Sequence, residues 1–189
     1  MSADADTRPE CGGPPIPSTG GGEREGQARP GRDGPASGFC WGDLHRELDW
    51  LPGGRLNMAH EAIDRHADGP RRDKPALIWD GKNGEHEQYT FGALKTLTNR
   101  FANVLKSLGI GRGDRVCLYL DRLPELYVAF LGILKIGAIV VPLSSHIEPD
   151  SLRKKLSHGA VKVVVTQPEL RRRMAAIIYE LFDLQHILV

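Results

Sequence analysis

The feature that most constrains this chain is a strand-and-helix unit that repeats through its C-terminal part. Apolar segments typical of buried strands centre on Leu118, Val140, Val164 and Ile187, so successive centres are 22, 24 and 23 residues apart. A segment with helical periodicity and a proline in its first turn separates each pair, at 124–136, 149–157 and 168–182. Alternation at this spacing predicts an α/β fold, with parallel strands joined by right-handed helical crossovers.

The residues before this repeat predict three further elements. A helix is expected over 57–67, capped by the asparagine at its first position. Two short strands, 76–79 and 85–89, flank a polar, glycine-containing turn and predict a β-hairpin. An amphipathic helix is expected from the cap Thr90 to Gly109. The first helix of the repeat is apolar nearly all round, which predicts burial on several sides.

The N-terminal residues differ in composition from the rest of the chain. Residues 1–38 contain 9 glycines and 6 prolines, and almost no large apolar side chains. Such a segment buries too little surface to offset the entropy of ordering it, so we predict a disordered tail. Residues 39–189 are then expected to form an incomplete, mainly parallel sheet with flanking helices and the hairpin.

Charge and composition exclude several classes of protein. The chain has 25 Lys and Arg against 24 Asp and Glu, which does not fit a nucleic-acid binder. It contains no apolar stretch long enough to span a membrane. Three scattered cysteines indicate neither a disulfide framework nor a zinc site, and they favour a reducing, cytoplasmic compartment. We find no catalytic motif, so no catalytic and no metal-binding residue is predicted.

Two polar clusters follow predicted strands, where parallel sheets bind ligands. Ser144, Ser145 and His146 come directly after an apolar strand, and they predict either ligand contacts or a loop that caps the next helix. Arg171–Arg173 is the densest positive run, and it predicts either a phosphate contact or a solvated helix face.

Several segments, taken together in order, resemble one family. They are Trp50–Asn57, Ala62–His66, Tyr89–Phe91, Gly113–Val116, Pro124–Tyr127, Gly132–Ile139 and Val163–Thr166. Their order and spacing resemble the N-terminal part of the AMP-forming acyl-CoA synthetases, which belong to the acyl-adenylate-forming superfamily. The opening segments are similar to the acetyl-CoA synthetase branch in particular.

The resemblance implies a ligase reaction in two halves. ATP and a carboxylate, with Mg²⁺, give an acyl-adenylate and pyrophosphate, and the thiol of CoA then displaces AMP. The family's phosphate-binding loop, magnesium and adenine motif, ribose-binding Asp and catalytic Lys find no match before Val189. We therefore expect the 189-residue chain alone to be inactive and to bind none of these cofactors tightly.

The resemblance also implies a CoA side of the site. The loop after the second strand of the repeat and arginines after the third lie by the CoA nucleotide in acetyl-CoA synthetases. These positions correspond to Ser144 and to Arg171, Arg172 and Arg173, with Arg172 the first choice. The family's Gly-Gly-Phe sequence in the loop is absent, which leaves the loop contacts open.

The sequence ends within a predicted strand, Ile187–Val189, which indicates a fragment of a longer ligase. A non-catalytic interaction module, or a subunit of a split synthetase that binds the missing remainder, is the alternative, because the last strand could pair with another chain. An unrelated α/β nucleotide binder is a third reading, which tight ATP binding would support.

Overall fold

The computed structural model describes residues 47–189, and Trp50–Val189 form one compact unit. The predicted tail at 1–38 lies outside the described residues, as does the start of the predicted domain at Phe39. The elements are η1 (His60–Asp64), α2 (Arg65–Ala67), β1 (Pro75–Asp80), β2 (His86–Thr90), α3 (Phe91–Ser107), β3 (Arg115–Tyr119), α4 (Pro124–Lys135), β4 (Ile139–Leu143), α5 (Pro149–His158), β5 (Val163–Thr166), α6 (Pro168–Arg173), η2 (Ile178–Glu180) and β6 (His186–Leu188).

The predicted opening helix is present and contains an irregular turn. Asn57 accepts hydrogen bonds at Oδ1 from the backbone N–H groups of Ala59 and His60, so it caps the helix as expected. Its Nδ2 donates to the carbonyl oxygens of Leu134 and Lys135, which end α4. Asn57 therefore provides hydrogen-bond partners for backbone groups at the start of one helix and at the end of another. The irregular turn of the opening helix is η1, a π-helix of five residues.

The hairpin and the amphipathic helix form where the sequence predicts them. Strands β1 and β2 pair in an antiparallel sheet. Thr90 Oγ1 accepts from the N–H of Ala93, 3.2 Å away, and so caps α3. Gly109 follows the helix with a φ of +77°, a conformation that glycine adopts without strain.

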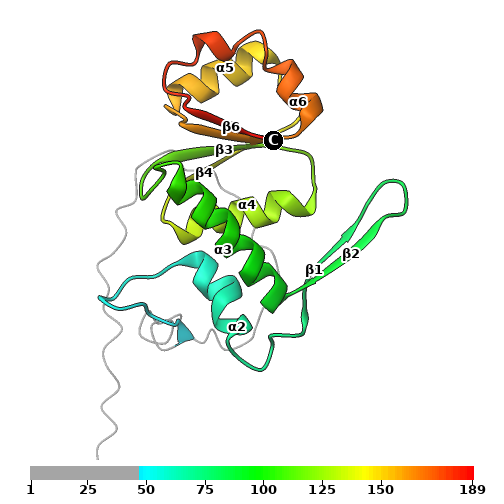
Figure 1. The fold of residues 1–189 in the computed structure, drawn as a ribbon, viewed down its shortest axis with the longest axis vertical. Coiled ribbons are helices and arrows are strands. Elements are labelled where there is room, and N and C mark those ends of the chain that lie inside the picture. The colour runs from blue at the N-terminus through cyan, green and yellow to red at the C-terminus, as the bar shows by residue number, and fades with distance from the viewer. Residues whose placement is uncertain (1–46) are drawn as a thin grey trace, which may run out of the picture. The chain divides into compact units, whose positions relative to one another are not determined.

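The repeating unit forms a four-stranded parallel sheet in the order β4-β3-β5-β6. The predicted parallel α/β fold is therefore confirmed. Helices α3 and α4 lie on one side of this sheet, and α5 and α6 lie on the other (Figure 1).

The two layers divide the side chains of each central strand between two cores. In β3, Val116 and Leu118 pack with α3 and α4, whereas Cys117 and Tyr119 pack with α5 and α6. This alternation follows from the two-residue period of a strand. Both faces of the sheet are covered by helices, so the sequence of a central strand such as β3 must be apolar on both sides and not only at alternate positions.

One expectation for the helices is wrong. The helix predicted over 168–182 ends at Arg173, and the chain continues in turns bonded mainly three residues apart, such as Ile177 N–H to Met174 O. These tight turns still bury Met174, Ile177 and Leu181 against the sheet. Helix α4 packs against α3 and against the sheet, as expected, while Tyr127 and Phe130 leave one side of it exposed.

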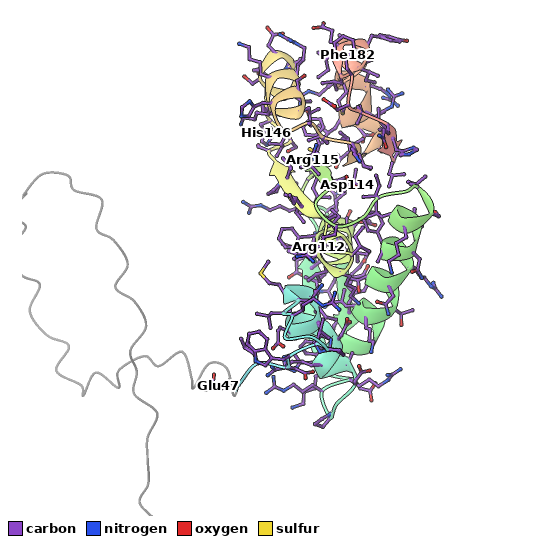
Figure 2. All side chains as sticks on the ribbon, turned by 90° about the vertical axis from the view of Figure 1, so that its left-hand side faces the viewer. Glu47, Arg112, Asp114, Arg115, His146 and Phe182 are labelled. Carbon is purple, nitrogen blue, oxygen red and sulfur yellow. The ribbon has the colours of Figure 1, made fainter. Side chains whose placement is uncertain are left out.

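The turns after α6 also carry two outward aromatic side chains. Tyr179 is 91% exposed and Phe182 is 96% exposed, and Phe182 lies at one end of the molecule (Figure 2). Within residues 47–189, no helix is both long enough and apolar enough to cross a membrane.

Candidate functional site

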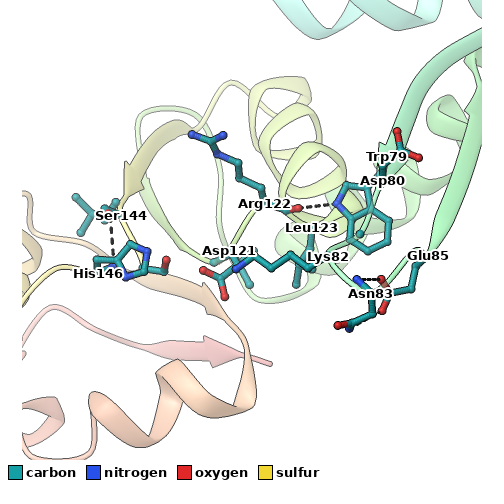
Figure 3. A pocket seen from close by; sticks show the side chains of 14 residues that line it. Trp79, Asp80, Lys82, Asn83, Glu85, Asp121, Arg122, Leu123, Ser144 and His146 are labelled. Carbon is teal, nitrogen blue, oxygen red and sulfur yellow. Dashed lines mark hydrogen bonds between the residues drawn. The ribbon is translucent and has the colours of Figure 1, made fainter.

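A cavity of about 780 Å³ opens at the carboxyl ends of β3 and β4. The loop after β3 and the loop after β4 form one side of it, and the tip of the β1–β2 hairpin forms the other (Figure 3). Leu120, Leu123 and Leu143 supply apolar surface, while the remaining lining is mostly polar. The position agrees with the rule that open parallel sheets bind ligands beyond the carboxyl ends of their strands.

The hairpin is fixed to the sheet by one side chain at this cavity. Trp79 Nε1 donates to the carbonyl oxygen of Arg122, 2.7 Å away and 43 residues distant in the sequence. Two acidic residues of the hairpin bond within the hairpin itself, since Asp80 contacts His86 and Glu85 accepts from Asn83. The hairpin thus forms a defined wall.

Asp121 is the centre of a network that joins three strand ends. Its backbone N–H donates to Gln167 Oε1, and Gln167 Nε2 donates back to Asp121 Oδ2 at 2.9 Å. A hydrogen bond from Ser145 lowers the pKa of the Asp121 carboxyl below its usual value, and Gln167, Lys82 and His146 lower it further against the effect of burial. Figure 3 shows Lys82 reaching from the hairpin toward Asp121.

The structure places Ser144 on the cavity wall. Its Oγ accepts from the N–H of His146 at 3.2 Å, which shapes the loop. The alternative role of this loop as a helix cap is wrong for Ser144, because the N-cap of α5 is Glu148 and no side chain caps it. The Ser144 hydroxyl therefore does not cap α5, and it lies on the cavity wall.

The three arginines of α6 do not line this cavity. Arg173 contacts the loop from behind: Nη1 donates to the Ser145 carbonyl at 2.7 Å and Nη2 donates to the Ile147 carbonyl at 3.3 Å. Arg172 and Arg173 are both exposed and Arg171 is partly exposed, so the hydrogen bonds to the loop, and not burial, distinguish Arg173 from Arg172. Of the four residues that the sequence predicted, Ser144 thus lies on the cavity wall and Arg173 bonds to the loop behind the wall. Arg171 and Arg172 lie outside the cavity.

The sequence analysis missed the other half of the site. Asp121 and Arg122 follow a predicted strand, and this position could have indicated them. Trp79 and Lys82 carry no such signal, because only the fold brings the hairpin to the sheet.

The arrangement is suited to binding rather than to bond-making. Cys117 is completely buried, and burial raises the pKa of its thiol to about 12, so it supplies no thiolate. No group of three or more His, Cys, Asp or Glu side chains within residues 47–189 could hold a metal ion. What remains is a cavity lined by two hydroxyls, three carboxylates and the cationic residues Lys82 and Arg122.

Comparison with known proteins shows where this fold recurs. The family model described as AMP-binding enzyme matches residues 63–186. This chain belongs to the AMP-binding enzyme family.

Within this family, the chain is similar to acetyl-coenzyme A synthetases. It is 43% identical over 124 residues to that of Gemmatimonas aurantiaca, covering 66% of this chain and 19% of the relative. It is 42% identical over 153 residues to that of Bacillus subtilis, covering 80% of this chain and 26% of the relative. The predicted resemblance to AMP-forming acetyl-CoA synthetases is confirmed, and the chain spans about a fifth to a quarter of the length of these relatives.

Solved structures agree with this assignment. A Brucella canis acyl-CoA synthetase superposes with a TM-score of 0.70 and is 28% identical, covering 79% of this chain and 26% of that one. An anthranilate CoA ligase in complex with anthranoyl-AMP superposes with a TM-score of 0.64 and is 26% identical. The match covers 76% of this chain and 26% of the ligase.

Proposed function

We propose that this chain forms the CoA side of an AMP-forming acyl-CoA ligase that acts on acetate or another short carboxylate. The complete enzyme activates the carboxylate with ATP to acyl-AMP and transfers the acyl group to CoA. The proposal is supported by the family and by the cavity at the sheet edge, which has Ser144 on its wall. We infer a cytoplasmic location from the three dispersed cysteines.

CoA fits the residues that surround the cavity. When bound, CoA supplies the thiol that attacks the activated carbonyl. Lys82 offers an ammonium group to an anionic part of CoA, and the Ser144 hydroxyl offers a hydrogen bond. Arg171 and Arg172, which lie outside the cavity, remain candidates for binding the phosphates of CoA, because a guanidinium group can donate two hydrogen bonds to one phosphate.

ATP and Mg²⁺ do not fit the described residues in the same way. Proteins usually hold a magnesium ion through one or two carboxylates together with substrate phosphates, and residues 47–189 contain no group of three or more His, Cys, Asp or Glu side chains that could hold a metal ion by themselves. We therefore derive no step of the adenylation half-reaction from this chain, and we expect the chain by itself to catalyse no ATP–pyrophosphate exchange.

A chimera tests the proposed function. In Bacillus subtilis acetyl-coenzyme A synthetase, the 153 residues matched by this chain are replaced with the corresponding residues of this chain. We expect the chimera to form acetyl-CoA, and we expect a Ser144→Ala variant to raise KM for CoA with little change in ATP–pyrophosphate exchange. A folded chimera that performs the exchange but forms no acetyl-CoA would contradict the CoA-side role.

A non-catalytic module that completes a synthetase in trans is the second candidate. The strongly exposed Tyr179 and Phe182 favour it, because such side chains commonly mark a contact surface. Mixing this chain with the Bacillus subtilis enzyme that lacks the matched segment tests it. Activity on mixing, abolished by a Tyr179→Ser/Phe182→Ser variant, supports this candidate, whereas activity only in the covalent chimera opposes it.

A further inference from the structure

Arg173 makes contacts different from those of its neighbours in the arginine run. Its planar guanidinium group bridges two backbone carbonyls of the loop after β4, those of Ser145 and Ile147. A guanidinium group holds two acceptors in one fixed geometry, which an ammonium group cannot do. Met174, the next residue, is completely buried and anchors this end of α6 in the core.

The same loop is held from two further directions. The hydroxyl of Tyr119, from β3, lies 3.5 Å from the Ser145 carbonyl oxygen. The side chain of Ser145 bonds to Asp121, which Gln167 holds in turn. The backbone of the cavity wall is therefore fixed by α6, by β3 and by the loop after β5.

We propose that Arg173 is a positioning residue of the CoA site: it acts through the carbonyls of Ser145 and Ile147 to hold the Ser144–Ile147 loop against the cavity, and it does not bind phosphate. This inference rests on the proposed function. It follows from the two donor contacts, which direct one N–H of Nη1 and one of Nη2 to main-chain oxygens of the loop.

The two roles differ in what a substitution costs. A residue that positions the wall contributes equally to every ligand that touches the wall, whatever the charge of that ligand. A residue that binds phosphate contributes only to phosphorylated ligands, and salt screens that contribution. Pantetheine carries no phosphate, whereas CoA does, so the two ligands separate the roles once the shifts of the Ser144–His146 amides show that each of them contacts the wall.

Titration of the full 189-residue chain with CoA and with pantetheine, followed by amide NMR shifts, tests the proposal. We expect Arg173→Ala to raise Kd for CoA and Kd for pantetheine by a similar factor, about three- to tenfold, at low and at physiological salt. We expect the amides of His146 and Ile147 to exchange faster with solvent. We expect Arg173→Lys to restore neither affinity, because one ammonium group cannot replace the bridge.

Arg172→Ala is the matched control, since Arg172 is an exposed arginine on the same helix. It should leave pantetheine affinity and loop exchange unchanged. If Arg173→Ala weakens CoA alone, and only at low salt, Arg173 binds phosphate and the proposal is wrong. If neither ligand is affected, the proposal is also wrong. Failure of the wild-type chain to bind either ligand would instead overturn the proposed function, and the positioning role with it.

Discussion

Lys135 and Asp64, 71 residues apart in the sequence, form an ion pair with 2.6 Å between Nζ and Oδ1. Lys135 also donates to Asn99 Oδ1 at 2.6 Å, so one ammonium group joins α4 to η1 and to α3. The two ion-paired side chains are only 9% and 17% exposed. This pair joins, in the fold, two of the segments that carry the family resemblance, Ala62–His66 and Gly132–Ile139.

Breaking this pair should strongly destabilise the chain. Lys135→Met leaves the Asp64 carboxylate largely buried without its partner, and we expect the free energy of unfolding to fall by about 3 kcal/mol. Urea denaturation followed by circular dichroism measures the change. Lys95→Met, which removes the more exposed pair of Lys95 with Asp68, is the control and should change stability far less. Equal losses in the two variants would contradict this ranking.

The close crossing of α3 and α4 should require Gly132. A Cβ atom at this position would lie 2.8 Å from Phe101 Cδ1 and 3.0 Å from the Thr98 carbonyl oxygen. Gly132→Ala should therefore reduce stability by about 1–3 kcal/mol, because the helices must separate. Gly111→Ala is the matched control, since nothing lies within 4 Å of a Cβ atom there. A Gly132→Ala variant as stable as the control would show that the helices separate without cost.

Asp114 should make stability depend on pH in the acid range. Lys162 Nζ lies 2.7 Å from Asp114 Oδ1, and this bond, with a second from the Gly111 N–H, lowers the pKa of the carboxyl below its usual value of 3.8. A lowered pKa in the folded state contributes stability above pH 3.8, and this contribution is lost as the pH falls through the folded-state pKa.

Asp114→Asn removes that dependence. The stability difference between wild type and variant should be largest near neutral pH and should shrink as the pH falls below 3.8. Urea midpoints measured across the acid range follow this difference. A difference that stays constant or grows on acidification would contradict the lowered pKa.

Cys117 should not react with thiol reagents while the chain is folded. Its side chain is completely buried, and its pKa of about 12 leaves a negligible thiolate fraction at neutral pH. In a Cys11→Ser/Cys40→Ser background, a thiol reagent should label Cys117 only after unfolding in urea. Rapid labelling without denaturant would mean that the layer of α5 and α6 opens readily from the sheet.

The sequence predicted the sheet because its signal is local and repeated. The periodicity of strands and helices predicted β3 to β6, their parallel direction and the helical crossovers between them. The rule that ligands bind beyond strand ends indicated Ser144. The opposite wall was not predictable, because Trp79 reaches Arg122 across 43 residues and no spacing records that contact. The contact of Arg173 with the loop after β4 was not predictable either, since a run of three arginines looks the same in the sequence whether or not one of them bonds to a loop.

The role of this chain as the CoA side of a ligase is tested most directly by mapping where CoA binds on it. The measurement is an amide NMR titration of the wild-type chain with CoA. We expect weak, saturable shifts that cluster at Lys82, Asp121 and Ser144–His146. Saturable shifts that cluster away from this cavity, or no shifts at all, would contradict the assignment of the cavity to CoA.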